Sequence, residues 1–226
     1  MALVKTGLAG HGAAWFAHKQ TAGKGQRGKS WQSNSGENII LSVLLDMSWL
    51  PVSQQFRLSM AISLAVRQFL SQYCPEDLTI KWPNDIYWRD RKAAGILVEN
   101  VIKGNIWQWA VVGVGININQ VIFDPGLPNP VSLKQITGKS YQVVELARNL
   151  CTFLEQSFSQ LKSQQSQDSL LVEYNSRLYK RLELVNFRDG NRKFSAKISG
   201  VDEKGKLILD PSAPKSYMFG ELEWLH

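Results

Sequence analysis

The chain has 226 residues, of which 44% are hydrophobic and 20% are charged, and its 26 Lys and Arg residues against 19 Asp and Glu residues give a formal net charge of +7. This length and apolar content can bury a sizeable core, which argues against a disordered basic chain and suits one large domain followed by a small one. The longest apolar runs are far shorter than the roughly 18 residues that a membrane-spanning helix needs, and no signal-peptide pattern follows Met1, so we expect a soluble, cytoplasmic protein with no membrane partner.

Apolar patterning predicts one helix and a series of strands in the first half of the chain. Apolar residues that recur every three or four positions predict an amphipathic helix over residues 54–73, which Pro75 ends. Alternating or continuous apolar residues, bounded by polar turns, predict strands over residues 12–20, 38–45, 78–82, 86–88, 93–100 and 106–118. Because short turns join the later strands, we expect an antiparallel meander and an α+β fold rather than alternating β-α-β units.

The second half of the chain changes its pattern near Glu183. Residues 123–130 are rich in Pro and Gly and predict a surface loop, and helical spacing predicts helices over residues 143–161 and 169–181. Short alternating segments then predict strands over residues 184–187, 193–199, 206–209 and 216–222. We therefore expect a large domain over residues 1–183 and a small β domain over residues 184–226.

The positive charge is concentrated near the N-terminus. Residues 1–31 contain five basic residues and no acidic residue, which accounts for +5 of the total. Nucleic-acid-binding proteins usually spread basic residues over a face and interleave aromatic residues. Here the excess is packed into the glycine-rich residues 23–29, which predicts a compact anion site rather than a track for a long polyanion.

That glycine-rich segment also matches two phosphate-binding patterns. Residues 23–30, Gly-Lys-Gly-Gln-Arg-Gly-Lys-Ser, fit GxxxxGK[ST], and residues 23–28 fit GxGxxG. Both patterns hold phosphate only where a helix follows the loop. The Ser-, Asn- and Gly-rich residues 30–38 do not favour a helix, so we reject a P-loop and a dinucleotide site. Glycines that admit a ligand and cations that attract an anion remain, and a basic surface loop is the alternative.

Two further segments carry candidate chemistry. Trp82-Pro-Asn-Asp85 is a turn that leaves a carboxylate at a strand end, and a hairpin would bring Lys92 near Asp85; a solvated ion pair is the alternative. Residues 112–119, Val-Gly-Val-Gly-Ile-Asn-Ile-Asn, place glycines inside a strand, which indicates close approach of a ligand or tight packing on a helix. Taken singly, each segment leaves both interpretations open.

Taken together and in this order, the motifs resemble those of biotin protein ligases, the enzymes that biotinylate biotin-dependent carboxylases. The resemblance is carried by residues 20–31 (Gln-Thr-Ala-Gly-Lys-Gly-Gln-Arg-Gly-Lys-Ser-Trp), 81–85 (Lys-Trp-Pro-Asn-Asp), 91–99 (Arg-Lys-Ala-Ala-Gly-Ile-Leu-Val-Glu) and 113–117 (Gly-Val-Gly-Ile-Asn). Residues 200–202 and 220–224 look like that family's small C-terminal cap. The resemblance implies an α+β fold in which a mixed β-sheet with flanking helices, related to class II aminoacyl-tRNA synthetases, precedes a small C-terminal β-barrel of the Src-homology-3 type.

The resemblance also implies a two-step reaction with ATP and biotin as small-molecule substrates and Mg²⁺ as the ion that accompanies the nucleotide. The biotin carboxylate attacks the α-phosphate of ATP, which gives biotinyl-5′-AMP and pyrophosphate. A lysine of a biotin carboxyl carrier domain, part of a carboxylase such as acetyl-CoA carboxylase, then attacks the anhydride. A lipoate-type ligase of the same superfamily and a catalytically weak binding module are the two alternatives.

The resemblance assigns roles to individual residues of the 1–183 domain, which would be the catalytic domain. Lys92 and Asp85 would be catalytic: the Lys92 ammonium would neutralise the converging carboxylate and phosphate, and Asp85 would orient the incoming lysine or bind a metal ion. Biotin would contact Gln20, Lys24, Gly25, Gln26, Lys92, Gly95, Gly113 and Gly115. The nucleotide would contact Gly23, Lys24, Gln26, Arg27, Trp31, Lys81 and Asn117, with Trp31 stacked on adenine.

The chain departs from the family pattern in two places. The family loop usually reads GRGRxGR, and Lys24 and Gln26 stand in place of two arginines here, which predicts a looser hold on the adenylate. Family members also begin with a strand, a Ser-Thr-Asn stretch and a helix before the segment equivalent to residues 8–20. Either the start has been assigned too late or part of the biotin pocket is missing. With no room for a helix-turn-helix we expect no DNA binding, and sheet pairing makes a homodimer a candidate assembly.

Overall fold

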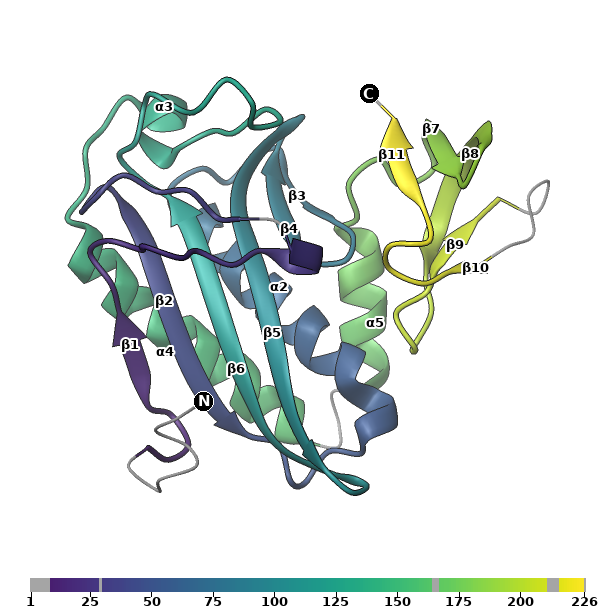
Figure 1. The fold of residues 1–226 in the computed structure, drawn as a ribbon, viewed down its shortest axis with the longest axis horizontal. Coiled ribbons are helices and arrows are strands. Elements are labelled where there is room, and N and C mark those ends of the chain that lie inside the picture. The colour runs from purple at the N-terminus through teal and green to yellow at the C-terminus, as the bar shows by residue number, and fades with distance from the viewer. Residues whose placement is uncertain (1–8, 29, 164–166, 211–215, 226) are drawn as a thin grey trace.

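A large sheet, backed by helices, lies beside a smaller C-terminal sheet (Figure 1). The large sheet packs against helices α2 (Gln55–Ser71) and α4 (Val143–Lys162), and α5 (Gln167–Ser176) lies between the two sheets. No helix of the described part of the chain is long and apolar enough to cross a membrane. The computed structural model describes residues 9–28, 30–163, 167–210 and 216–225.

The large sheet contains the first strands of the chain in the order β1-β2-β6-β5-β4-β3. Every neighbouring pair in it is antiparallel, so the mixed sheet expected from the resemblance is a wrong prediction. The physical reason on one side of the sheet is that tight turns join β3, β4, β5 and β6 in succession, and a tight turn permits only antiparallel pairing. The pairs β2–β6 and β1–β2 are antiparallel across longer connections. The strands are β1 (Ala14–Phe16), β2 (Asn38–Asp46), β3 (Leu78–Lys81), β4 (Asp85–Trp88), β5 (Arg91–Lys103) and β6 (Ile106–Asn117).

One face of this sheet forms the core and the other is open. On β6, Val112 and Val114 are fully buried, whereas Gly113 and Gly115 between and after them point the other way. Because successive residues of a strand point to opposite faces of the sheet, one face packs on α2 and α4, and the other has only glycine at these two positions of β6. The segment that joins β1 to β2 crosses this open face (Figure 1).

The long helices predicted over residues 54–73 and 143–161 are confirmed as α2 and α4. The helix predicted over residues 169–181 ends early, at Ser176, because the next residues pair with the sheet edge: Ile80 N donates to Arg177 O and Tyr179 N donates to Ile80 O. A second difference is α3 (Leu133–Thr137), which the sequence analysis missed although Ser132 and Gln135 form a capping box at its start.

The C-terminal residues form a five-stranded antiparallel sheet in the order β10-β9-β8-β7-β11. The single strand predicted over residues 216–222 is wrong, since Gly220 has a φ of 90° and a turn separates two short strands there. Among the described residues β10 and β11 stand at opposite edges without a pairing that would close a barrel. The strands are β7 (Leu184–Asp189), β8 (Arg192–Val201), β9 (Leu207–Leu209), β10 (Ser216–Tyr217) and β11 (Glu223–Leu225).

Specific contacts dock this sheet onto the larger one. The indole Nε1 of Trp82 donates to Gly205 O at 2.9 Å, and the side chain of Asn175 accepts from Val201 N and donates to Val201 O. A methyl carbon on Gly205 would lie 2.5 Å from the Phe56 ring, so the turn approaches α2 as closely as a glycine permits. The smaller sheet is thus held against the hairpin that carries the Trp82-Pro-Asn-Asp85 motif.

Candidate active site

A closed loop holds the glycine-rich segment over the open face of the sheet. Trp31 N donates to Gly23 O at 3.0 Å, and Lys24 forms an isolated β-bridge with Ser30, so the base of the loop is pinned by its own backbone. Two ends fixed in this way leave the residues between them as a flap above the strands. The flap is the part of the chain in which the sequence analysis found the excess of positive charge.

The flap contains one short 3-10 turn, η1 (Gln26–Gly28). Residues 31–37, which follow it, form no helix before β2 begins. The helix that a P-loop needs is therefore missing, which confirms the rejection of that pattern. Lys29 and the side chain of Arg27, two cations of the glycine-rich segment, lie outside the described residues, and the contact of Arg27 with a nucleotide stays a prediction.

Two glycines form a bare floor beneath the Trp31 ring. Gly95 on β5 pairs with Gly115 on β6. A methyl carbon built on Gly115 would lie 2.5 Å from Cε2 of Trp31, and one on Gly95 would lie 3.0 Å from Cζ3. At Gly113 the nearest atom would be the Leu97 carbonyl oxygen at 3.7 Å, an ordinary contact. A side chain at 115 would displace the Trp31 ring and one at 95 would crowd it, and the structure thus places Trp31 on this floor.

A β-bulge aims Lys92 into the same site. The pairing of β5 with β4 shifts by one residue at Ala93, between the pairs made by Ala94 and by Lys92. Strict alternation would put Lys92 and Gly95, three positions apart, on opposite faces of the sheet. The extra residue reverses the alternation, so the Lys92 side chain stands on the open face, and its Cε would be 3.2 Å from a methyl carbon on Gly95.

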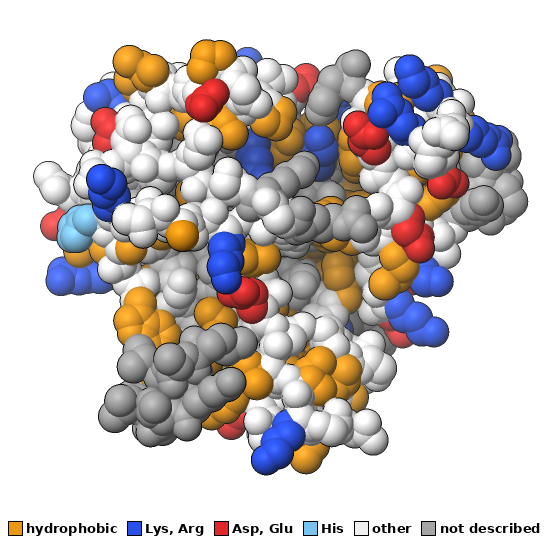
Figure 2. All heavy atoms as spheres, viewed as in Figure 1, with side chains coloured by type: hydrophobic (Ala, Val, Ile, Leu, Met, Phe, Trp, Pro, Cys, Tyr) orange, Lys and Arg blue, Asp and Glu red, His pale blue; other side chains and the backbone are white. Residues whose placement is uncertain are grey.

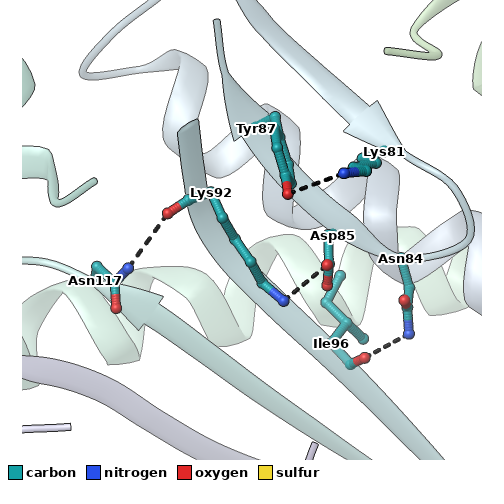
Figure 3. Close-up of polar contacts among 7 residues, drawn as sticks. All are labelled: Lys81, Asn84, Asp85, Tyr87, Lys92, Ile96 and Asn117. Atoms are coloured by element: carbon teal, nitrogen blue, oxygen red, sulfur yellow. Dashed lines mark hydrogen bonds and ion pairs between the residues drawn. The ribbon is translucent and has the colours of Figure 1, made fainter. Parts of the chain in front are cut away.

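Lys92 and Asp85 form an ion pair at this floor (Figure 3). Nζ of Lys92 lies 2.7 Å from Oδ2 of Asp85, and the two side chains are 27% and 30% exposed. The Asn84 side chain donates to Ile96 O, which ties the turn before Asp85 to β5. The hairpin that the sequence predicts is confirmed, and the ammonium remains partly open to solvent and to a ligand.

Asn117 braces the backbone around Lys92. Its Nδ2 donates to Lys92 O at 3.4 Å and to Val131 O at 3.2 Å, and its side chain is almost fully buried. Lys92 N in turn donates to Asn129 O, and Val131 N donates to Lys92 O. The structure thus gives Asn117 a supporting position behind Lys92, and a nucleotide contact of this residue stays a prediction.

Two buried polar atoms of the site have no hydrogen-bond partner within the described part of the chain. They are Oε1 of Gln20, an acceptor, and Nε1 of Trp31, a donor. Gln20 lies beside the flap, since a methyl carbon on Gly23 would be 2.9 Å from its Oε1. Because a buried polar atom without a partner is costly, these two atoms indicate a place for the polar groups of a ligand.

A cleft of about 650 Å³ opens beside this floor. The flap forms one wall with Gly25 and Gln26 among others, Leu97 to Glu99 of β5 form the second, and Phe219 of the C-terminal sheet contributes to the third. Lys24 Nζ and Glu99 Oε1 approach to 4.0 Å across it. From the same side, Figure 2 shows the surface hollowed between the flap and the C-terminal sheet.

Lys81 lies on the open face, directly opposite Asp85 in the β3–β4 register. Its Nζ is 3.4 Å from Tyr87 Oη (Figure 3), and aromatic rings surround it, including that of Trp224. Burial and the charge of Asp85 both raise the pKa of Tyr87, so this phenol stays neutral around pH 7. Lys81 therefore stands at the edge of the site nearest the C-terminal sheet.

The donor set does not fit a resident metal ion. Within the described ranges no three His, Cys, Asp or Glu side chains gather into a metal site. Asp85 offers a carboxylate, but Lys92 is bonded to it. Mg²⁺ is usually held by one or two carboxylates together with the phosphates of its substrate. A lone, ion-paired carboxylate leaves the phosphates to supply most of the ligands.

Some residues at the site come from distant parts of the chain and could not be predicted from the sequence. Phe219 lines the cleft, and residues 129–131 hold the Lys92 backbone, yet neither was predicted to be at the site. The only available signal for Phe219 was its place beside the C-terminal motif of residues 220–224. No local pattern links residues 129–131 to Lys92, because that contact depends on the loop after β6 folding back.

A floor of paired glycines, a lysine that a β-bulge directs onto it and that is bonded to an aspartate, and a basic flap together form a candidate site for an anionic ligand, and comparison with known proteins identifies the family. The sequence model of the Biotin/lipoate A/B protein ligase family matches residues 9–117. The Biotin–[acetyl-CoA-carboxylase] ligase of Paracoccus denitrificans is 30% identical over 208 residues, which cover 88% of this chain and 84% of that protein. The chain belongs to the biotin protein ligase family.

Two further relatives extend the comparison. The bifunctional ligase/repressor BirA of Escherichia coli (strain K12) is 30% identical over 221 residues, and the match covers 93% of this chain but 66% of that protein, just under two thirds. A structure of the biotin protein ligase of Aquifex aeolicus in complex with biotin and ATP matches with a TM-score of 0.80 and 25% identity, covering 96% of this chain and 90% of that one. The α+β fold with antiparallel sheets is thus the fold of this family.

Proposed function

We propose that the protein is an ATP-dependent biotin ligase that joins biotin to a lysine of a biotin carboxyl carrier domain. The observation that carries the proposal is the Lys92 ammonium on the glycine floor, 2.7 Å from Asp85 and beneath a basic flap. An ammonium in this place can neutralise a carboxylate and a phosphate that would otherwise repel each other. The name of the Paracoccus denitrificans relative points to an acetyl-CoA carboxylase as the source of the carrier.

In the first step a biotin carboxylate oxygen attacks the α-phosphorus of ATP, and the bond from that phosphorus to the pyrophosphate oxygen breaks. Lys92 reduces the repulsion between the two anions, and Lys24, Gln26 and Arg27 cover the phosphates from the flap. Gln20 accepts a hydrogen bond from a ureido N–H of biotin, which supplies a partner for its buried Oε1. Trp31 covers Gly95 and Gly115, so its indole moves aside when the ring system of biotin lies on these two glycines and on Gly113.

In the second step the amine of the carrier lysine attacks the acyl carbon of biotinyl-5′-AMP, AMP leaves, and the amine loses a proton. Asp85 is bonded to Lys92 beside the reacting groups and can orient the incoming amine. Gly23, Gly25, Trp31, Lys81 and Asn117 complete the surroundings of the adenylate. Mg²⁺ enters with ATP as part of the substrate, in line with the lack of a cluster of three metal-binding side chains among the residues that the structure describes.

The test is transfer to a carrier domain. The protein is incubated with MgATP, biotin and a recombinant biotin carboxyl carrier domain, and the mass of the carrier domain is measured by mass spectrometry. A mass gain of one biotinyl group, absent from a carrier whose target lysine is replaced by arginine, is expected. A gain with lipoate but not with biotin would favour a lipoate-type ligase.

Biotin-dependent exchange of pyrophosphate into ATP measures the first step by itself. If neither exchange nor transfer occurs while biotin still binds, the protein is a binding module and the proposed reaction is wrong.

A further inference from the structure

The ammonium of Lys81 is enclosed by aromatic rings from three separate parts of the chain. Nζ lies 4.9 Å from the ring centre of Tyr87 on β4, 5.8 Å from that of Tyr179 after α5, and 4.9 Å from that of Trp224 on β11. All three distances fall within the roughly 6 Å over which a ring face attracts a cation. We call Tyr87, Tyr179 and Trp224 the aromatic cage.

Packing fixes the members of the cage relative to one another. The ring centres of Tyr87 and Tyr179 are 5.1 Å apart, and those of Tyr179 and Trp224 are 5.9 Å apart. Trp224 also packs edge-on against Phe187, which is fully buried in the C-terminal sheet. The cage is therefore a preformed feature that spans the junction of the two sheets.

The rings act on Lys81 as neutral aromatic faces. Burial raises the pKa of both Tyr87 and Tyr179, and a hydrogen bond to Asp90 adds to the effect at Tyr179. Both phenols thus keep their protons around pH 7, and neither offers Lys81 a phenolate charge. Besides its hydrogen bond to Tyr87 Oη, the ammonium is attracted by the ring quadrupoles, and this attraction is strongest for the indole of Trp224.

The cage also determines where the Lys81 charge stands relative to the reacting groups. Lys81 and Asp85 are directly opposite on β3 and β4, a register that brings their Cβ atoms to about 5 Å. Asp85 nevertheless bonds to Lys92, and the Lys81 ammonium lies against the rings. A cation held in this way stays at the edge of the site nearest the C-terminal sheet, opposite Asp85.

We propose that Trp224 is a positioning residue of the C-terminal sheet that holds the Lys81 ammonium in place for the phosphates of the nucleotide. This inference rests on the proposed function, in which Lys81 contacts ATP. Trp224 does not touch the nucleotide in this scheme and acts through Lys81 alone. The smaller sheet thereby contributes to nucleotide binding by a cation–π contact, in addition to the cleft wall that Phe219 supplies.

Binding measurements test the proposal without depending on turnover. The probe is α,β-methylene-ATP with Mg²⁺ in the presence of biotin, because this analogue cannot release pyrophosphate. For Trp224→Leu we expect a dissociation constant for the analogue about threefold to tenfold above that of the wild type, the loss of one partly desolvated cation–π contact. The dissociation constant for biotin alone should not change, and Trp224→Phe should lie between the two.

A matched control comes from the same sheet. Phe194 on β8 packs against Phe187 and Tyr217 at 5.9 and 6.3 Å, and its ring is not part of the cage. Phe194→Leu should therefore disturb the packing of the sheet as Trp224→Leu does while leaving the affinity for the analogue unchanged. Equal losses in the two variants, or parallel losses for the analogue and for biotin, would mean that Trp224 is merely structural and would overturn the proposal.

A double-mutant cycle shows whether Trp224 acts through Lys81. In a Lys81→Met background, Trp224→Leu should weaken binding of the analogue no further, whereas additive losses would overturn the proposal. NMR spectra of protein with ¹³C-labelled lysine give an independent readout. The ε-CH₂ signal of Lys81 is identified by its loss in Lys81→Met. Ring currents should shift this signal upfield in the wild type, and it should move downfield in Trp224→Leu.

The proposed function and this inference fail separately. A wild-type protein that binds the analogue in a Trp224-dependent manner but transfers no biotin would disprove the ligase reaction and leave the inference standing. A Lys81 signal that does not respond to Trp224→Leu, or a wild-type protein that does not bind the analogue, would overturn the inference.

Discussion

At the scale of single residues, the Lys92–Asp85 pair has a geometry that suits chemistry better than stability. Both side chains are close to one-third exposed, and ion pairs this close to solvent contribute little to the free energy of unfolding. The surrounding backbone is nevertheless held from both sides, through Asn129 and Val131. A lysine whose main chain is fixed and whose head group is accessible is positioned to meet a ligand.

Replacing Lys92 by methionine therefore separates activity from folding. Lys92→Met keeps the length of the side chain and removes the charge, and we expect biotin-dependent pyrophosphate exchange to fall at least about 100-fold, the typical cost of losing a preorganised group that stabilises developing charge. The midpoint of denaturant unfolding should stay near that of the wild type. Lys103→Met, on the distal β5–β6 turn, is the control. Undiminished exchange in Lys92→Met would remove this residue from the mechanism.

We expect the flap residues Lys24 and Gln26 to determine how tightly an adenylate is covered. The Lys24 side chain is 74% exposed and only 4.0 Å from Glu99, and Gln26 lines the cleft without a charge. In the double variant Lys24→Arg and Gln26→Arg, bidentate guanidinium groups should lower the release of biotinyl-5′-AMP about tenfold, as expected for added charge-assisted hydrogen bonds. Free adenylate is measured by chromatography after a fixed number of turnovers, with Lys19→Arg as the control. Unchanged release would show that these positions do not govern retention.

At the scale of elements, the sequence predicted the helices and strands that follow a regular apolar period and missed the β-bulge that interrupts one strand. The strands and the two long helices follow from the apolar period, and the motif at residues 82–85 was correctly placed in a hairpin near Lys92. The bulge at Ala93 was not predictable, because Ala93 and Ala94 are small apolar residues that fit either face of a strand. The place of Trp31 on the glycine floor was missed for a similar reason, since no local pattern records which distant strand a loop residue covers.

The glycine floor gives a prediction with a built-in comparison. Gly115→Ala would set a methyl group 2.5 Å from the Trp31 ring, whereas Gly113→Ala would make only an ordinary contact at 3.7 Å. We expect the first variant to displace the indole and to lose about 1–3 kcal/mol of stability, as overpacking does. The second should stay within about 0.5 kcal/mol of the wild type. Urea unfolding measures both. Equal stabilities would mean that Trp31 does not lie on Gly115 in solution.

At the scale of the whole molecule, the site is shared between two sheets that are distant in sequence. The sequence predicted the change of pattern near Glu183 and strands beyond it, but no single-sequence signal indicated how the smaller sheet would dock. The contacts that dock it, such as Trp82 with Gly205 and Asn175 with Val201, join residues whose local patterns are unrelated. The cleft between the flap and Phe219 exists only because of that docking.

Phe219 tests whether the smaller sheet closes the cleft. Its ring stands edge-on to Trp82, 5.7 Å between centres, and lines the cleft, whereas its neighbour Met218 is similarly exposed and is not part of the lining. Phe219→Ala removes one wall, so we expect more biotinyl-5′-AMP to escape per turnover, with a loss of stability of about 1 kcal/mol for a half-exposed side chain. Met218→Ala should match the wild type in both respects. If the two variants released the same amount of adenylate, Phe219 would not help to close the cleft, and the flap alone would close it. The C-terminal sheet would then affect the site only through its contacts with the Trp82 hairpin and with Lys81.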